Sequence, residues 1–305
     1  MKYSLAPLEG ITTRIYRNAV HDFFGDGIDR YYTPFLVVHE KRAMSSKEIK
    51  EVLPENNKGV NLIPQILADE ADGFLRIDSA LYDFDYREVN LNLGCPSKTV
   101  ASKGRGSGFL GRLRELDEFL SEIFSGNKCD ISIKTRIGES DPDEFEELLE
   151  IFNKYPVKDL IIHPRVRYEY YKGRPHRDIF YKAVAKSRNP VSYNGDIQGK
   201  ADVDEVLKGC GGKLDSVMIG RGMIRDPSLI RQLAGGDCYT KEELKDFLKR
   251  LRMDYEQEMS GETPVLQKLK EIWSYMGADH DDGVKDLLKC RSLAEYKMLE
   301  KKILQ

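Results

Sequence analysis

Short strand-like stretches alternate with amphipathic helical stretches along most of this 305-residue chain. The strand candidates are apolar and rich in β-branched or aromatic residues, and the stretches between them carry apolar residues at helical spacing. Eight strands are predicted, at residues 3–7, 30–34, 60–67, 89–93, 130–135, 159–163, 190–194 and 214–220. Strands that are separated by helices pair in parallel through crossover connections. Eight such units over about 230 residues predict an α/β protein with a (β/α)8 TIM barrel.

Helix signals between these strands support the barrel. Helices are expected over residues 14–24, 112–124, 178–188 and 202–207, and another starts at Asp141-Pro142. A capping aspartate followed by proline at the first helical position is a typical helix start. An open doubly wound sheet is the alternative. It is less favoured because no glycine-rich phosphate fingerprint follows the first strand.

The C-terminal part of the chain carries helix signals but no strand signals. Thr240-Lys241-Glu242-Glu243 and Ser292-Leu293-Ala294-Glu295 have the pattern of capping boxes, and Thr263-Pro264 starts a helix between them. Gly235-Gly236 precedes the first of these helices. We therefore expect a barrel domain over residues 1–236 and a small all-helical domain over residues 237–305.

Composition narrows the class of protein. The formal net charge is −3, which gives no global sign of a nucleic-acid partner but does not exclude local basic clusters. No apolar run approaches the roughly 18 residues that span a bilayer, and the N-terminal residues lack a signal peptide's apolar core. The five cysteines are scattered, without the spacing of metal ligands or of a disulfide framework. We expect a monomeric cytoplasmic protein with no metal ion and no membrane partner.

Residues suited to a binding or catalytic site gather at the ends of the predicted strands, with Gln65 inside the third strand. They are Pro7, Gln65, Asn92, Cys95, Lys134, Arg136, His163, Asn194, Gly195, Asp196, Gly220 and Arg221. Each alone has an ordinary explanation, since a strand-end lysine can be solvated and Asn-Gly-Asp is common in turns. In a barrel, however, the carboxyl ends of all strands meet at one mouth, where barrel enzymes keep their chemistry. Their joint position therefore favours a functional site.

The strand at residues 89–93 has the least usual pattern. Val89, Leu91 and Leu93 share one face, and Asn90 and Asn92 share the other. Buried amides need hydrogen-bond partners, so the asparagines are expected to point into the barrel. The cysteine at position 95 follows at the mouth, as either a small buried hydrophobe or a catalytic thiol.

Glycines at the ends of the last two strands indicate a phosphate site. Gly195 and Gly220 leave backbone N–H groups accessible, and Arg221 adds a positive charge at the position where barrels often bind phosphate. Lys134 and His163 are suited to donate hydrogen bonds to an electron-rich ring. A phosphorylated cofactor or substrate is therefore expected.

A set of motifs in collinear order resembles the tRNA-dihydrouridine synthase family. The motifs are Leu5-Ala6-Pro7-Leu8-Glu9-Gly10, Asn92-Leu93-Gly94-Cys95-Pro96-Ser97, Ile133-Lys134-Thr135-Arg136-Ile137-Gly138, His163 with Arg165, Asn194-Gly195-Asp196-Ile197 and Val217-Met218-Ile219-Gly220-Arg221-Gly222. The ordered set is much more specific than any one of them.

The resemblance implies an FMN-dependent enzyme that reduces uridine in tRNA to 5,6-dihydrouridine, with NADPH reducing the flavin. Residues 1–236 would hold FMN and residues 237–305 would bind tRNA. Cys95 is implied to be the catalytic acid: hydride passes from the flavin to uracil C6, and the thiol protonates C5. Such a donor needs a thiol that stays protonated. The implied cofactor contacts are Pro7, Leu8, Gln65, Lys134, His163, Asn194, Gly195, Asp196, Gly220 and Arg221.

Two basic clusters near the expected mouth are suited to RNA. One follows Cys95 and begins at Lys98, and the other interleaves arginines with tyrosines over residues 165–177. This mixture combines phosphate contact with base stacking, although a solvated loop is the plain alternative for the second cluster. The expected substrate contacts are Asn92, Lys98, Arg136, Arg165, Tyr171 and Arg174.

Two other functions are kept open. One is an FMN barrel oxidoreductase that acts on a free small molecule, which would need neither the basic loop nor the helical tail. The other is a non-catalytic tRNA-binding protein with a vestigial flavin site. The intact Cys95 and the full set of flavin-contacting residue types argue against the second.

Overall fold

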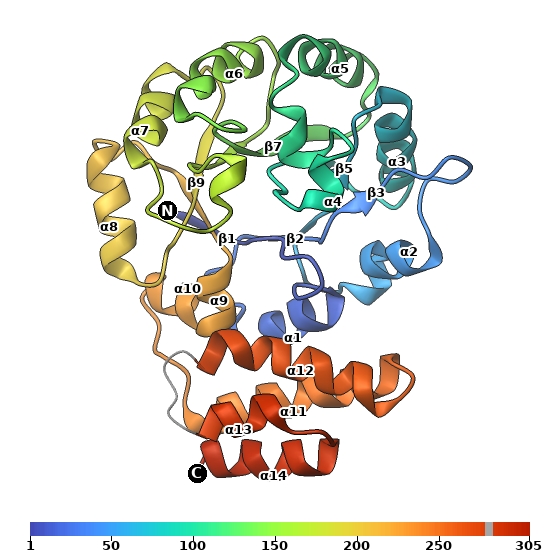
Figure 1. The fold of residues 1–305 in the computed structure, drawn as a ribbon, viewed down its shortest axis with the longest axis vertical. Helices are drawn as coiled ribbons and strands as arrows, with labels where there is room; N and C mark the ends of the chain where they lie inside the picture. The colour runs from blue at the N-terminus through green and yellow to red at the C-terminus, as the bar shows by residue number, and fades with distance from the viewer. Residues whose placement is uncertain (278–282) are drawn as a thin grey trace.

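A computed structural model describes residues 1–277 and 283–305. Within them, ten short strands surround one axis and helices surround the strands (Figure 1). The strands are β1 (Lys2–Leu5), β2 (Arg30–Tyr32), β3 (Leu36–Val37), β4 (Leu62–Ile63), β5 (Gln65–Leu67), β6 (Glu88–Leu93), β7 (Asp130–Arg136), β8 (Leu160–His163), β9 (Val191–Asn194) and β10 (Ser216–Ile219). Every recorded pair is parallel, in the order β3-β5-β6-β7-β8-β9-β10-β1-β2-β4.

Two of the expected strands are split in the structure. The second continues after a gap as β3, and the third is divided into β4 and β5 by Pro64, which has no backbone N–H to donate. β2 pairs with β4, and β3 pairs with β5. Thr33 bridges the gap, because its side-chain oxygen accepts a hydrogen bond from the Gln65 backbone N–H at 2.9 Å. β2 and β3 together form one position in the barrel, and so do β4 and β5, so the ten strands fill eight positions, here called staves. The predicted (β/α)8 barrel is confirmed.

The barrel helices follow the strands in turn. They are α1 (Arg14–Phe24), α2 (Ser46–Val52), α3 (Ala71–Asp83), α4 (Lys98–Ala101), α5 (Leu113–Gly126), α6 (Phe145–Phe152), α7 (Arg177–Lys186), α8 (Lys200–Gly209), α9 (Arg221–Arg225) and α10 (Leu229–Leu233). Sequence patterns had not predicted α2 or α3. A capping box starts α2: Ser45 and Glu48 accept hydrogen bonds from each other's backbone N–H groups.

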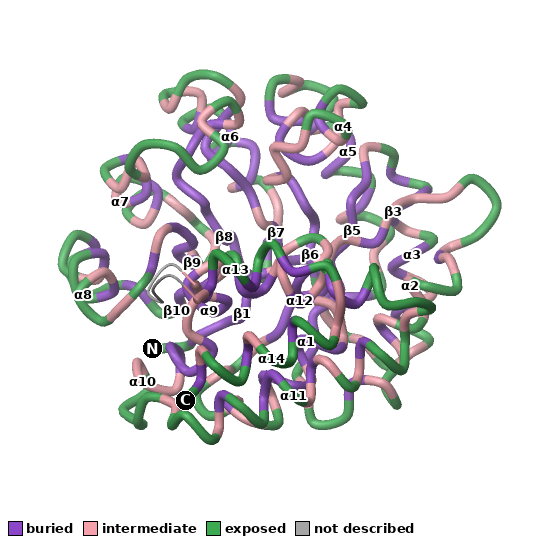
Figure 2. The backbone as a smooth tube through the Cα atoms, turned by 60° about the horizontal axis from the view of Figure 1, so that its bottom comes forward, coloured by how far each residue is buried: buried purple, intermediate pink, exposed green. Residues whose placement is uncertain are grey.

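The strands lie at the centre of the molecule and the outer faces of the helices meet solvent (Figure 2). Apolar residues of the strands pack against the helices, whereas a polar group closes the barrel at the amino ends of the strands. There Ser192 Oγ donates to Asp159 at 2.7 Å, and Arg30 pairs with Glu88 at 3.3 Å. Burial raises the pKa of Asp159 to about 6, with Glu88 adding to the rise.

The C-terminal segment is helical, as predicted. It contains α11 (Lys241–Glu258), α12 (Glu262–Met276), α13 (Gly283–Lys289) and α14 (Leu293–Ile303). The expected capping box at Thr240 is formed. At Ser292 only half of the box is formed, because the Glu295 carboxylate accepts from the Arg291 backbone N–H instead. Sequence patterns had not predicted α13.

The helical segment packs on the barrel beside α1 and α9 (Figure 1). In α11, the Phe247 ring lies 5.2 Å from the Phe24 ring and 6.0 Å from the Tyr16 ring of α1, centroid to centroid. In α12, Lys268 Nζ donates to the Gly10 carbonyl at 2.8 Å. The division into two domains with separate roles stays a prediction. Among the described residues, no helix is long and apolar enough to cross a membrane.

Candidate active site at the barrel mouth

Two adjoining hollows open at the carboxyl ends of the strands. The first, of about 570 Å³, is lined by Ala6, Pro7, Leu8, Lys134, His163, Tyr171, Asn194, Gly195, Asp196, Ile197, Gln198, Met218, Ile219, Gly220, Arg221 and Gly222. The second, of about 540 Å³, is lined by Pro7, Leu8, Glu9, Pro34, Phe35, Gln65, Asn92, Gly94, Cys95, Pro96, Lys134, Arg136, His163 and Tyr171. They share five lining residues and therefore form one elongated site. The site gathers every expected cofactor contact, together with Cys95, Asn92, Arg136 and Tyr171.

Parallel register brings these residues together. Asn92 of β6 lies beside Lys134 of β7, and Arg136 of β7 lies beside His163 of β8. Because all strands run in the same direction, the last residue of each one reaches the same rim. The mouth therefore collects side chains from distant parts of the sequence.

The two asparagines of β6 belong to a chain of amide hydrogen bonds that ends at Cys95. Asn90 donates to Ser132 Oγ at 3.0 Å and accepts from Gln65 Nε2 at 2.7 Å. Gln65 Oε1 in turn accepts from Asn92 Nδ2 at 2.7 Å. The Asn92 side-chain oxygen, Oδ1, accepts from the backbone N–H groups of Gly94, at 3.1 Å, and Cys95, at 2.9 Å. This amide chain fixes the turn that carries the thiol.

Cys95 is held from its other side as well. Its carbonyl accepts from the Ser107 hydroxyl at 2.7 Å and from the Ser107 backbone N–H at 3.1 Å. Burial raises the pKa of the Cys95 thiol, and the nearby Lys134 and Arg136 offset that only in part. At neutral pH the side chain is a thiol that can donate a proton, as a catalytic acid requires.

The mouth is rich in positive charge. Burial lowers the pKa of Lys134 to about 7, with a contribution from Arg136. Among the described residues, the Lys134 ammonium has no hydrogen-bond or ion-pair partner. Burial, together with surrounding cations, also lowers the pKa of His163 well below its usual value, so the imidazole is neutral. A buried amine that has no counter-ion and a pKa of about 7 fits an electron-rich or anionic ligand, which would stabilise its protonated form.

Backbone that contains glycine lines the end of the first hollow near β9 and β10. Asn194 Nδ2 donates to the Met218 carbonyl at 2.8 Å, which fixes the end of β9. Gly195 follows, and a Cβ at that position would lie 3.2 Å from Tyr193 Oη and 3.5 Å from His163 Cδ2. Asp196 then adopts a positive φ of 44°. The backbone here is accessible to a ligand because glycine adds no side chain.

The positive charge of Arg221 is already partly neutralised by a neighbouring carboxylate. Its guanidinium pairs with Asp196 and lies 4.3 Å from the centroid of the Tyr171 ring. Tyr171 is 45% exposed and borders both hollows. A phosphate at this end would meet an arginine that is already oriented by a carboxylate and an aromatic ring.

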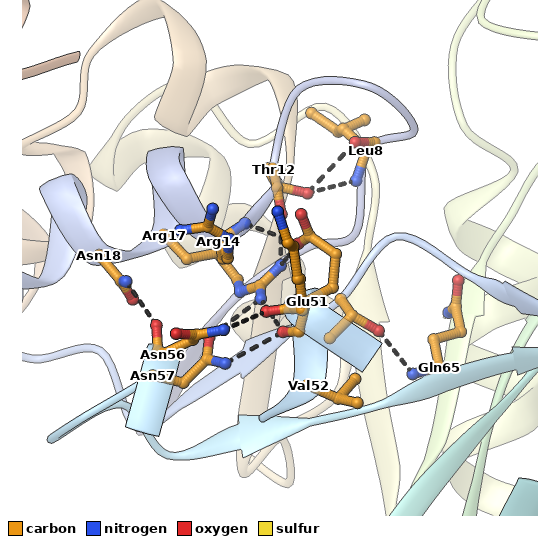
Figure 3. Close-up of polar contacts among 12 residues, drawn as sticks. Leu8, Thr12, Arg14, Arg17, Asn18, Glu51, Val52, Asn56, Asn57 and Gln65 are labelled. Carbon is orange, nitrogen blue, oxygen red and sulfur yellow. Dashed lines mark hydrogen bonds and ion pairs between the residues drawn. The ribbon is translucent and has the colours of Figure 1, made fainter. Parts of the chain in front are cut away.

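A buried arginine holds the loop between β1 and α1, which carries Pro7 and Leu8 (Figure 3). Thr12 Oγ1 accepts from the Leu8 backbone N–H at 2.7 Å. Arg17, which is fully buried, donates to the Thr12 carbonyl at 2.8 Å and to the Glu51 carbonyl at 2.8 Å. It also donates to Asn57 Oδ1 at 3.0 Å. The loop at the mouth is therefore anchored to α2 and to the segment after it.

The structure corrects the expectation that Arg165 faces RNA. Arg165 has no exposed surface, and its guanidinium lies inside the loop that follows β8. It pairs there with Asp196, which the sequence could not reveal because the pairing depends on how the two loops fold together. Arg136 is also buried, and it donates to the carbonyls of Gly94, Val166 and Tyr170.

Lys98 and Arg174 are exposed at the rim rather than in either hollow. Neither forms an ion pair with any residue that the structure describes. Other members of the basic clusters are neutralised locally: Arg167 pairs with Glu139, and Arg177 pairs with Glu205. The charge available to an outside anion is thus smaller than the sequence suggests.

Two residues of the second hollow were missed at the sequence level. Glu9 and Phe35 line it together with Cys95. Glu9 lies in the turn directly after β1, so its position just beyond a strand end could have identified it. The same signal was present for Phe35, which comes directly after the predicted strand at residues 30–34.

Comparison with known proteins agrees with this geometry. The sequence model of the family described as dihydrouridine synthase (Dus) matches residues 4–293. The probable tRNA-dihydrouridine synthase 2 of Bacillus subtilis (strain 168) is 27% identical over 267 residues, which cover 85% of this chain and 79% of that protein. The probable tRNA-dihydrouridine synthase of Staphylococcus aureus (strain COL) is 25% identical over 309 residues, covering 97% and 91%.

Among solved structures, the old yellow enzyme from Trypanosoma cruzi superposes with a TM-score of 0.54 at 10% identity. The superposition covers 85% of this chain and 94% of that one, and it supports the fold alone. The family match extends over nearly the whole chain and contains the motifs at the barrel mouth. The resemblance is confirmed: this chain belongs to the dihydrouridine synthase family.

Proposed function

We propose that the protein reduces uridine in tRNA to 5,6-dihydrouridine, with FMN as its cofactor and NADPH as the reductant. One observation carries the proposal: the Cys95 thiol, whose pKa is raised, lines the same hollow as Lys134, whose amine has no partner among the described residues. Reduction of the uracil C5–C6 bond needs a proton donor beside a hydride donor. The family relationship supports this chemistry for the mouth of this barrel.

The residues of the mouth fit a flavin mononucleotide. We propose that Lys134 and His163 contact the ring and ribityl part and that Gln65 contacts the ring edge, because all three line the hollows. At the other end of the first hollow, the backbone of Asn194, Gly195 and Gly220 is accessible to the phosphate group of the cofactor. Arg221 adds a positive charge there. The Asp196 carboxylate is occupied by two arginines, so its role is to orient Arg221. When bound, the flavin supplies the hydride for uracil C6.

Cys95 supplies the proton that completes the reduction at uracil C5. The raised pKa keeps the thiol protonated until the substrate takes the proton. The thiolate that remains is stabilised by the positive charges of Arg136 and Lys134, which both favour its charged form. Solvent then returns the proton, so hydride and proton together account for the two electrons and two hydrogens gained by the base.

A uridine must leave its stack to reach this mouth. Tyr171 at the rim offers an aromatic face, and Lys98 and Arg174 offer charges for the phosphate backbone. The helical segment over residues 237–305 is proposed to bind the rest of the tRNA. Its α12 reaches the mouth through the Lys268 contact with the β1–α1 loop. We expect the protein to act as a monomer in the cytoplasm.

The proposal is tested with the purified protein, FMN, and an unmodified tRNA transcript. With NADPH present, mass spectrometry of the digested tRNA is expected to show uridine residues heavier by two hydrogens. Parallel reactions with NADH and with free uridine test the reductant and the substrate class. Reduction of free uridine as fast as tRNA would favour the small-molecule enzyme. A protein that cannot be loaded with FMN would overturn both enzymatic functions.

A further inference from the structure

Every N–H of the buried Arg165 guanidinium has a partner inside the protein. Nη1 donates to His163 Nε2 at 3.1 Å and to Asp196 Oδ1 at 3.1 Å. Nη2 donates to the Gly173 carbonyl at 2.7 Å and to Asp196 Oδ2, and Nε donates to the Lys172 carbonyl at 3.2 Å. The side chain has no exposed surface and no donor left for RNA.

The contact with His163 has a consequence for the imidazole. A guanidinium has only donors, so the ring nitrogen that faces it must be an acceptor without a proton. A neutral imidazole carries one N–H, which must then be at Nδ1. The ring stays neutral because burial lowers its pKa, and the positive charges of Arg136, Lys134, Arg165 and Arg221 lower it further. Among the described residues, His163 Nδ1 has no hydrogen-bond partner, and the ring lines both hollows.

We propose that Arg165 is a positioning residue that fixes His163 as its Nδ1–H tautomer, so that the mouth presents a hydrogen-bond donor to its ligand. The ligand group that this donor recognises is an acceptor, such as a carbonyl or an unprotonated ring nitrogen. The identification of that acceptor with the flavin rests on the proposed function. The tautomer itself does not, because it is set by contacts within the protein.

Only arginine can make this set of contacts. Its planar fork grips both oxygens of Asp196, and the same nitrogen that donates to Asp196 Oδ1 also donates to His163. A lysine would bring the charge from a single point and could not hold both groups at once. Asp196 therefore also helps to fix the tautomer, because it holds the Arg165 guanidinium in its orientation toward the imidazole.

A plainer role is that Arg165 merely closes the loop through the carbonyls of Lys172 and Gly173. That role predicts a loss of stability but no change in the histidine tautomer. Arg167 provides the matched control, because it lies in the same loop, pairs with Glu139 and makes no contact with His163. Arg167→Met should therefore loosen the loop without changing the tautomer.

The test is long-range ¹H–¹⁵N NMR of the protein labelled with ¹⁵N-histidine, without added flavin. His163→Asn identifies the His163 signals among the five histidines. The wild-type protein and Arg167→Met are expected to show protonated Nδ1 and unprotonated Nε2 throughout neutral pH. Arg165→Met is expected to show an exchanging mixture or the Nε2–H form. Arg165→Lys replaces it if the methionine variant does not fold, with the same expectation.

A wild-type ring with its proton on Nε2, or an unchanged spectrum in a folded Arg165 variant, would overturn the inference. FMN titration gives a second readout. Loss of one oriented donor should weaken FMN binding about tenfold in Arg165→Met, and much less in Arg167→Met. Equal weakening in both variants would also contradict a positioning role. A fixed tautomer in a protein that does not reduce tRNA would refute the proposed function and leave the role of Arg165 intact.

Discussion

The side-chain oxygen of Asn92 accepts a hydrogen bond from the backbone N–H of Cys95 at 2.9 Å. Asn92 is the fifth residue of β6, whereas Cys95 lies in the turn beyond the end of that strand. The bond therefore ties the proton donor to the sheet. Because Asn92 is itself held by Gln65, the position of the thiol depends on a chain of amides that crosses from β5 to β6. A single substitution in this chain should affect both stability and turnover.

Asn92→Leu should lower the free energy of unfolding by about 1–3 kcal/mol and slow dihydrouridine formation. The leucine leaves the N–H groups of Gly94 and Cys95 without their acceptor, so the turn at the mouth loses its fixed geometry. Urea denaturation and a tRNA reduction assay measure the two effects. Asn61→Ala is the control, because its one side-chain bond to the Asp29 carbonyl is exposed and its loss should cost less than about 0.5 kcal/mol. Equal costs for both variants would contradict the structural role of Asn92.

The affinity for FMN should fall as pH rises through about 7. Burial lowers the pKa of Lys134 to about 7, and an anionic ligand beside the ammonium raises that pKa again. Binding therefore favours the protonated lysine, which is depleted above the pKa of the free protein, by up to about tenfold per pH unit. Fluorescence quenching of FMN measures the affinity at each pH.

Lys134→Met serves as the reference for that titration. It removes the lysine's titration but leaves that of the FMN phosphate, so the difference between the two pH profiles belongs to Lys134. The variant should bind FMN more weakly at low pH and lose the Lys134-dependent slope. Parallel profiles for the two proteins would show that Lys134 does not titrate with the ligand.

Arg174→Glu and Lys98→Glu should weaken tRNA binding and reduce its salt dependence. Each residue is exposed at the rim, and neither has an ion pair among the described residues. Loss of one phosphate contact should reduce the slope of log affinity against log salt by about 0.7–0.9. Filter binding across a salt series provides the measurement. Arg114→Glu, on the outer face of α5, is the control, because Arg114 pairs with Glu118 and is 89% exposed. A slope that changes only in the control would place the RNA elsewhere.

The polar group at the amino ends of the strands, which contains Asp159, should make the free energy of unfolding depend on pH. Burial raises the pKa of Asp159 from its ordinary value of 3.8 to about 6. The folded state then holds this proton more tightly than the unfolded state, so the contribution of Asp159 to stability falls as pH rises from about 4 to about 6, by up to about 3 kcal/mol. Urea denaturation of wild type and Asp159→Asn over this range measures the difference. If the two stability curves stay parallel, Asp159 has no raised pKa.

The barrel could be predicted from the sequence because each strand and helix has its own local pattern of apolar residues. The alternation of strands and helices indicates parallel pairing, which brings all strand ends to one mouth. This is why Cys95, Lys134 and His163 could be grouped without coordinates. The split staves could not be predicted in the same way. Their gap is stabilised by Thr33, whose hydroxyl pairs with the Gln65 backbone across neighbouring staves, and that contact has no local signature.

Arg165 illustrates a second limit. An arginine within a basic, tyrosine-rich loop suggests a solvent-facing residue, yet this one is buried. Its burial depends on the loop folding back, so that the carbonyls of Lys172 and Gly173 reach the guanidinium. It also depends on the ion pair with Asp196, which lies in the loop after the neighbouring strand β9. None of these partners can be inferred from spacing along the chain.

The most direct test of the central claim is a single-turnover reaction of FMN-loaded protein, reduced beforehand, with an unmodified tRNA transcript. Mass spectrometry of the digested tRNA follows dihydrouridine over time, for wild type, Cys95→Ala and Cys238→Ala. Wild type and the exposed Cys238→Ala control should react alike, and Cys95→Ala should be slower by about 10²–10⁴-fold while still binding FMN. Undiminished dihydrouridine formation in Cys95→Ala would contradict the assignment of Cys95 as the acid, and no dihydrouridine in any of the three would contradict the proposed function.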